Sequence, residues 1–177
     1  EEPVISVEVS GEARAYPVQI LLWHELVNDV VGGVPVLISY CPLCNSAIVF
    51  DRRVEGGDAR TFGVSGLLRM SDLIMYDHQT ESLWQQITGE AIVGTEVGRR
   101  LTFLPSQTVS WQEFRNAFPD GLVLSINTGY VRNYGGTQYT EYDQPGSGTY
   151  FPFETEEDDR LDGKQRVLAV EIDGDAV

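Results

Sequence analysis

Two cysteines stand three positions apart in the segment Cys41-Pro42-Leu43-Cys44, and the chain contains no others. Apolar runs at 34–40 and 47–52 flank the pair, so we expect it to lie on a tight connection between two strands. This spacing lets both sulfurs face one point, as a disulfide or as two ligands of a soft metal. We therefore expect the sulfurs within about 4 Å of each other. A thioredoxin-like redox pair is less favoured, because that motif should open a helix.

A metal bound by two thiolates needs further ligands, and the sequence offers few soft ones. The only histidines are His24 and His78. The sequence around His24 begins like a zinc-protease helix, but Asn28 stands where the second histidine is needed, so that motif fails. His78 lies in a polar, turn-like stretch and is expected at the surface. We take His24 as the third ligand beside Cys41 and Cys44, with copper, iron or zinc as the metal. The alternative is a structural histidine packed beside the preceding tryptophan.

Enzyme motifs are incomplete throughout the chain. The segment at 63–67, GVSGL, lacks the final glycine of a nucleophile elbow, and no phosphate-binding loop is present. The acidic run at 154–162 starts like a calcium-binding EF-hand loop but lacks its ligand pattern. The sequence therefore assigns no catalytic residue and no substrate, and whether the protein is an enzyme stays open.

The 177 residues suit a single domain and carry 27 acidic and 12 basic side chains, for a net charge of −15. This balance disfavours nucleic acid as a partner, and no apolar run is long enough to span a bilayer. Of the basic residues only Lys164 is a lysine. An excess of carboxylates with so little lysine is typical of proteins from salt-loving organisms, in which salt screens the repulsion. An acidic protein from a mesophile with a GC-rich genome is the alternative.

The pattern along the chain is mainly that of short strands, so we expect one mainly β domain of antiparallel strands with one or two short helices. Strands are predicted at 34–40, 47–52, 60–64, 72–76, 82–86, 91–93 and 100–104. Helical spacing predicts a helix over 17–27, and a capping box, Ser110 with Glu113, predicts another over 110–118. The stretch at 128–153, rich in Tyr, Gly and Pro, is expected to be a long ordered loop with a few short extended pieces.

A repeat links the two ends of the chain. Residues 4–13 resemble residues 167–176, and both read as an alternating strand followed by a Ser-Gly or Asp-Gly turn. Residues 166–177 are therefore interpreted as the start of a second hairpin similar to the one at 4–18. Similar hairpins at the two ends of a domain often lie side by side. We expect residues 167–172 to pair with another strand, either of this domain or of a neighbouring chain, and residues 4–9 are the favoured partner.

Five ordered motifs resemble the bacterial and archaeal family called domain of unknown function 3179. These motifs are WHELVND at 23–29, YCPLC at 40–44, FGVSGLLR at 62–69, SDLIMYD at 71–77 and SLWQQ at 82–86, and the later Thr128-Gly129-Tyr130 and Arg160-Leu161 fit as well. The resemblance implies a location in the cell envelope or outside the cell, but no biochemical activity. One departure is Met70, where the family pattern leads us to expect Asn or a similar polar residue.

Two functions follow as hypotheses. The first is a metal-binding or redox domain of the cell envelope or exterior, with Cys41, Cys44 and His24 as its site. The second is a non-catalytic structural or interaction module, for example a subunit of an extracellular assembly. In that case Cys41 and Cys44 form a disulfide, and strand edges provide self-assembly. Metal analysis and thiol titration of the purified protein distinguish the two.

Overall fold

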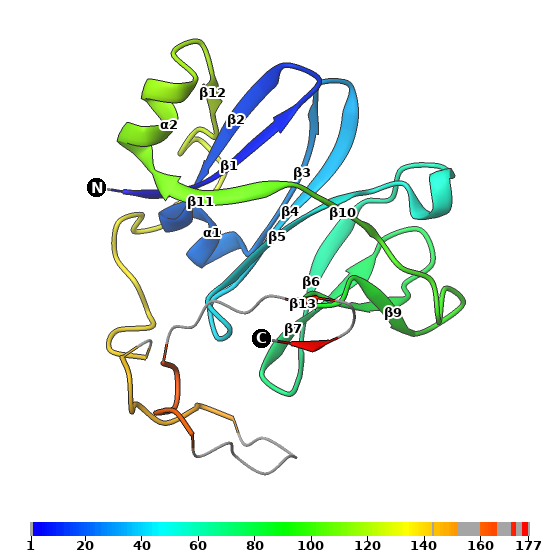
Figure 1. Ribbon diagram of the computed structural model, residues 1–177. Helices are drawn as coiled ribbons and strands as arrows, with labels where there is room; N and C mark the ends of the chain where they lie inside the picture. The colour runs from blue at the N-terminus through cyan, green and yellow to red at the C-terminus, as the bar shows by residue number, and fades with distance from the viewer. Residues whose placement is uncertain (1, 143, 152–159, 166–170, 173–174, 177) are drawn as a thin grey trace.

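The structure, a computed structural model, describes residues 2–142, 144–151, 160–165, 171–172 and 175–176. The described part of the chain is mainly β, with three small four-stranded sheets, one two-stranded sheet and two short α-helices (Figure 1). Among the described strands one pair is parallel, β2 (Glu12–Pro17) with β12 (Leu122–Val123), and all the others are antiparallel. The predicted fold class is confirmed. No described helix is long and apolar enough to cross a membrane.

The first sheet has the strand order β11-β1-β2-β12. Its remaining elements are β1 (Pro3–Val9), β11 (Ser106–Ser110) and the covering helix α2 (Trp111–Ala117). The predicted first hairpin turns at Ser10 and Gly11, whose φ values of 51° and 82° are those of a type I′ turn. The predicted capping box also forms, because the Glu113 backbone N–H donates to the Ser110 side chain and the Glu113 carboxylate accepts from the Ser110 backbone.

The second sheet has the strand order β10-β5-β4-β3. Its strands are β3 (Leu26–Val31), β4 (Val34–Cys41), β5 (Ser46–Asp51) and β10 (Thr102–Leu104). Helix α1 (Val18–His24) precedes it and is shorter than the helix predicted over 17–27. Glu25, with φ of 58°, ends the helix, and Leu26 then pairs with Ser39 of β4. The prediction of helix beyond His24 was wrong because strand pairing with β4 outweighs helical spacing there.

The third sheet has the strand order β6-β7-β8-β9. Its strands are β6 (Phe62–Arg69), β7 (Asp72–Asp77), β8 (Leu83–Gln85) and β9 (Glu90–Val93), preceded by the 3₁₀ turn η1 (Val54–Gly56). The turn between β6 and β7 consists of Met70 and Ser71, with φ values of 52° and 63°. Positive φ at both central residues defines another type I′ turn, and Asn or Gly tolerates this backbone better than Met does. This requirement gives a physical reason for the polar residue expected in place of Met70.

The second sheet lies between the other two. Side chains on successive residues of β4 point to opposite faces, so Val36 and Ile38 enter one core while Leu37 and Cys41 enter another. The first core is shared with the first sheet and α1, and the second core is shared with the third sheet. Cys41 belongs to the second core and therefore faces the third sheet.

Two short strands near the end of the chain pair with each other. Strand β13 (Glu171–Ile172) pairs with β14 (Asp175–Ala176), whereas residues 166–170 lie outside the described residues. Strand β1 pairs with β2 on one side and with β11 on the other, so neither edge is free. The prediction that residues 4–9 pair with residues 167–172 was therefore wrong for Glu171 and Ile172.

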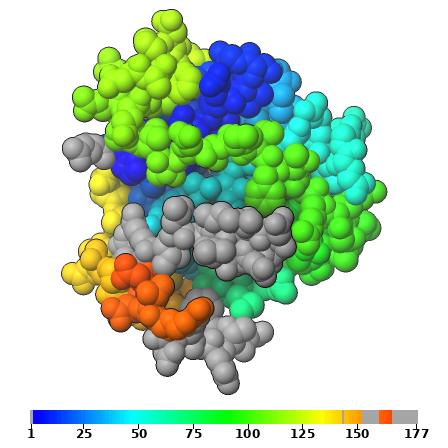
Figure 2. Space-filling view, viewed as in Figure 1, coloured from blue at the N-terminus to red at the C-terminus, as the bar shows by residue number. Residues whose placement is uncertain are grey.

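Residues 128–151 form a loop without a helix or strand in their described part. The predicted loop is confirmed there, but the few short extended pieces expected in it do not form strands. The single lysine, Lys164, attaches residues 160–165 to this loop. Its Nζ donates to Ser147 Oγ at 3.0 Å and to the Gly148 carbonyl at 2.6 Å, and it lies 3.2 Å from the centre of the Tyr142 ring. Figure 2 shows the two segments side by side on one face of the molecule. Most of the acidic run at 154–162 lies outside the described residues.

Candidate functional site

The two cysteines lie at a tight turn between the central strands β4 and β5. Cys41 ends β4 and pairs in register with Ser46, the first residue of β5. Within the turn the Cys44 backbone N–H donates to the Cys41 carbonyl at 3.2 Å, and Asn45 has φ of 47°. This geometry brings the Sγ atoms of Cys41 and Cys44 to 2.8 Å from each other. The predicted separation of within about 4 Å is confirmed, and both cysteines are free thiols.

The β6–β7 turn of the third sheet contacts this pair. The carbonyl oxygen of Ser71 lies 3.4 Å from Cys44 Sγ and 3.8 Å from Cys41 Sγ. The next residue, Asp72, places its Oδ1 3.4 Å from Cys44 Sγ. Its Oδ2 accepts a hydrogen bond of 3.1 Å from the Ile87 backbone N–H. Cys41, Cys44 and Asp72 form a group whose ligand atoms all lie within 4.8 Å of one another, and this group could hold a metal ion.

The contact between the two sulfurs shifts the pKa values of the two cysteines in opposite directions. A hydrogen bond from the Cys44 thiol stabilises the Cys41 thiolate and lowers the pKa of Cys41. The same hydrogen bond, together with burial and the negative charges of Cys41 and Asp72, raises the pKa of Cys44. The first proton therefore leaves the pair more easily than the second, and a cation could take the place of a lost proton.

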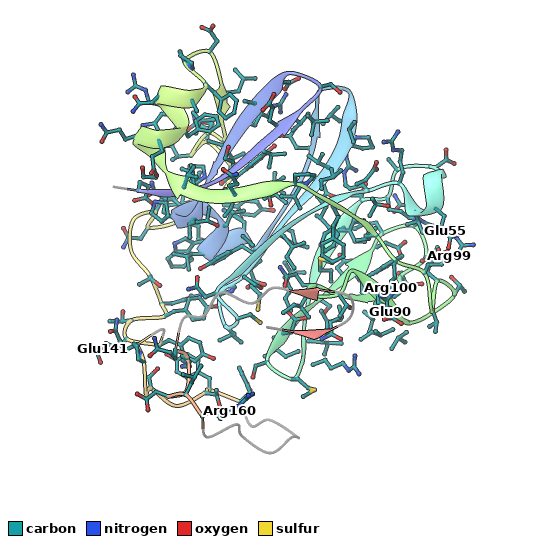
Figure 3. All side chains as sticks on the ribbon, viewed as in Figure 1. Glu55, Glu90, Arg99, Arg100, Glu141 and Arg160 are labelled. Carbon is teal, nitrogen blue, oxygen red and sulfur yellow. The ribbon has the colours of Figure 1, made fainter. Side chains whose placement is uncertain are left out.

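Asp72 is a buried carboxylate without a basic partner among the described residues. Its relative exposure is 4%, and it belongs to none of the ion pairs in the described part of the chain. Arg69, which pairs in register with Asp72, donates to Gln85 Oε1 at 2.5 Å. Elsewhere in the described part of the chain, Arg99 pairs with Glu55 and Arg100 with Glu90, all labelled in Figure 3. Buried carboxylates are normally paired or bound to a metal, and Asp72 with the two thiols beside it could take part in holding one.

A buried glutamine connects the two sheets that supply the site. Gln86 is fully buried, and its Oε1 accepts from Ser46 Oγ at 3.0 Å while its Nε2 donates to Ser39 Oγ at 3.1 Å. Its backbone N–H donates to the Leu73 carbonyl at 3.0 Å. The following N–H, that of Ile87, is the one that holds Asp72. Gln86 therefore links the strands that carry the cysteines to the strand that carries the carboxylate.

His24 lies in a different environment and is not a member of the cysteine group. Its Nε2 is 2.6 Å from the hydroxyl of Tyr134, which in turn lies 2.7 Å from Thr128 Oγ1. Burial, and secondarily the charge of Arg132, lowers the pKa of His24. The ring borders a cavity of about 370 Å³ that is also lined by Asn28 and Thr128. The structure thus brings Asp72, rather than His24, to the two sulfurs.

The other sulfur and imidazole side chains are packing or surface groups. His78 is exposed, as expected, and stacks on the Tyr76 ring at 4.9 Å. Met75 is fully buried in the core between the second and third sheets.

A further cavity, of about 320 Å³, opens beside the cysteine turn. Its lining includes Tyr40, Pro42, Asn45, Tyr139 and Tyr142.

Sequence reasoning missed Asp72 as a site residue. It was predicted only as the first residue of a strand at 72–76, and it lies 28 positions beyond Cys44. The available signal was an acidic residue beginning an otherwise apolar strand, DLIMY. An acidic residue on a buried strand needs a partner, but the pattern does not name that partner.

The fold and the site define a mainly β domain with a buried thiol–carboxylate group at the junction of two sheets. The chain belongs to the family described as "Protein of unknown function (DUF3179)", which matches residues 1–177. The resemblance seen in the five motifs is thereby confirmed. No curated protein and no solved structure matches the chain.

Proposed function

We propose that the protein is a metal-binding domain whose site consists of Cys41, Cys44 and Asp72. The observation that carries this proposal is the buried Asp72 carboxylate, which has two thiols beside it and no basic partner among the described residues. Two thiolates and a carboxylate would place three negative charges in one buried space. A divalent cation removes this repulsion by replacing the protons and binding all three groups.

The sulfur separation suits a site that adjusts slightly on binding. The Sγ atoms lie 2.8 Å apart, whereas a tetrahedral metal with metal–sulfur distances of about 2.3 Å holds two sulfurs about 3.8 Å apart. An opening of about 1 Å is therefore required. Cys44 is half-buried and lies in a turn, so a change in its side-chain rotamer supplies this opening while Cys41 stays in the core.

The proposal is tested by metal analysis and titration of the purified protein. Protein isolated without chelators should contain close to one equivalent of a transition metal. The metal-free protein should bind Co²⁺ with the intense sulfur-to-cobalt absorption of thiolate ligation. Asp72→Asn should lower zinc affinity by more than about tenfold because a charged donor is lost. Asp120→Asn, the same exchange at an exposed position, serves as the matched control. An Asp72→Asn protein that binds zinc like the wild type would refute the proposed ligand set.

A dithiol redox site is the second candidate, and two observations favour it. The 2.8 Å sulfur separation is close to bonding distance, since a disulfide requires about 2.05 Å, and the pKa of Cys41 is lowered. Thiolate attack also requires access, which the neighbouring 320 Å³ cavity would provide. A metal-free protein whose thiols oxidise and reduce reversibly in a glutathione redox titration would favour this function. An inert disulfide without metal would instead favour the structural module.

We further propose that the domain acts in the cell envelope or outside the cell. This proposal rests on the resemblance to a family whose members often carry export signals. In such an oxidising compartment two adjacent thiols readily form a disulfide, and a bound metal would protect the thiols from oxidation. Fractionation of the native cells with an antibody against the domain tests the location. Recovery in the cytoplasmic fraction alone would contradict it.

A further inference from the structure

A fourth potential donor lies against the two sulfurs. The Ser71 carbonyl oxygen lies 3.4 Å from Cys44 Sγ and 3.8 Å from Cys41 Sγ, and no donor other than these thiols reaches it in the described part of the chain. Ser71 is only 5% exposed, so water has little access to this oxygen. The carbonyl faces the thiols because both Met70 and Ser71 adopt positive φ, which turns the backbone sharply before Asp72.

Resting on the proposed metal-binding function, we propose that the Ser71 carbonyl oxygen is the fourth ligand of a closed site of two sulfurs and two oxygens. In a tetrahedral site with metal–sulfur distances of about 2.3 Å and metal–oxygen distances of about 2.1 Å, sulfur and oxygen lie about 3.6 Å apart. The three contacts of this kind measure 3.4, 3.4 and 3.8 Å. Among these four measured separations, only that between the two sulfurs, at 2.8 Å, differs from the tetrahedral value by more than about 0.2 Å.

The donor set determines the class of metal. Thiolates suit soft and borderline ions, whereas carboxylate and carbonyl oxygens suit harder ones. Zn²⁺ accepts both kinds of donor in tetrahedral geometry, and Cd²⁺ serves as its probe. A Cu⁺ ion would use the sulfurs alone. Because all four positions come from the protein, no position is left for water or a substrate, and the site binds its metal without hydrolytic chemistry.

The chain allows a direct measurement on this one carbonyl group. Ser71-Asp72 is the only Ser-Asp pair in the sequence. Protein carrying ¹³C in serine carbonyls and ¹⁵N in aspartate therefore gives one correlated NMR signal for this peptide bond. We expect the Ser71 carbonyl resonance to shift when one equivalent of Zn²⁺ binds, and the shift to be absent in Cys44→Ser. X-ray absorption of the zinc-loaded protein should show two sulfur and two oxygen neighbours.

Two further measurements separate this inference from the proposed function. Azide added to the Co²⁺-loaded protein should leave its spectrum unchanged, because a closed site offers no exchangeable position. Asp72→Asn should weaken Zn²⁺ binding by more than about tenfold. The same change should alter Cu⁺ affinity by less than about threefold, since Cu⁺ would be bound by the two sulfurs alone. A spectrum that changes with azide, or a Ser71 carbonyl resonance that does not move, overturns the fourth ligand while leaving the three-residue site intact. Absence of any metal binding by the wild type overturns the proposed function itself.

Discussion

Replacement of Gln86 by leucine tests whether the junction between the second and third sheets sets the geometry of the site. Leucine keeps much of the volume of glutamine but removes its amide. The change deletes three hydrogen bonds: from Ser46 Oγ at 3.0 Å, to Ser39 Oγ at 3.1 Å and to the Ser46 carbonyl at 3.5 Å. The backbone bond from Gln86 to Leu73 does not depend on the side chain.

The expected loss of stability follows from those bonds. Each contributes about 1 kcal/mol, and a buried partner left unsatisfied costs about 1–3 kcal/mol. Ser39 Oγ still donates to the Ile48 carbonyl, and Ser46 is half-buried, so water compensates in part. We therefore expect the free energy of unfolding of the metal-free protein to fall by about 2–4 kcal/mol. Zinc affinity should also fall, by about 10–100-fold, because the segment that holds Asp72 through Ile87 loses its anchor.

The assay measures zinc affinity by competition with a chromophoric chelator, at a temperature where each variant is fully folded. Denaturant titration supplies the change in stability. Val4→Ala is the matched control, since it removes two buried methyl groups from the core under α2 and costs about 1–3 kcal/mol far from the site. The control should keep wild-type zinc affinity. If Gln86→Leu lowers stability as expected but binds zinc as tightly as the control does, Gln86 does not position the site and the reasoning is refuted.

Three further predictions concern the turn, the thiols and the charge. Met70→Asn should raise the free energy of unfolding by about 1 kcal/mol, because Asn tolerates the φ of 52° at this position better than Met does. Little packing is lost, since Met70 is 40% exposed. An unchanged thermal melt would contradict this prediction. In the metal-free protein, ultraviolet thiolate absorbance should show one proton leaving below the ordinary thiol pKa and the second well above it, and two coincident titrations would show that the pair is uncoupled. The stability that comes from the lowered pKa of Cys41 is lost as the pH falls through that pKa. The stability that comes from the raised pKa of Cys44 is lost as the pH rises through the raised pKa of Cys44. The pair therefore contributes most to folding stability near the ordinary thiol pKa. With a net charge of −15, the melting temperature should rise from dilute buffer to molar salt, and a melting temperature independent of salt would remove the halophilic interpretation.

Local patterns in the sequence were sufficient where neighbouring residues decide the conformation. The Ser10-Gly11 turn, the Ser110 capping box and the proximity of Cys41 and Cys44 all follow from residues a few positions apart. Their geometry depends on backbone preferences and short hydrogen bonds, which hold in almost any fold.

Predictions failed where a distant strand competes with a local preference. Residues 25–27 continue the helical spacing of α1, yet Leu26 and Val27 pair with Ser39 and Ile38 of β4. Strand β11 was not predicted, because SQTVS is a short and mostly polar strand that forms by pairing with β1. Such pairings depend on which strands meet in space, and this is not encoded in the strand's own pattern.

The same distinction between local pattern and tertiary contact applies to the candidate site. The sequence by itself determined that the two sulfurs lie close together, because a tight turn with a two-residue gap brings the two side chains to one place. It could not determine the third donor: His24, the nearest soft ligand by type, contacts Tyr134 instead, and Asp72 reaches Cys44 from another sheet. Only the packing of the third sheet against the second, across the core that holds Cys41, decided which carboxylate faces the thiols. The physical reason is that a ligand set is defined by distances between side chains, and distances between residues far apart in the chain are set by tertiary packing.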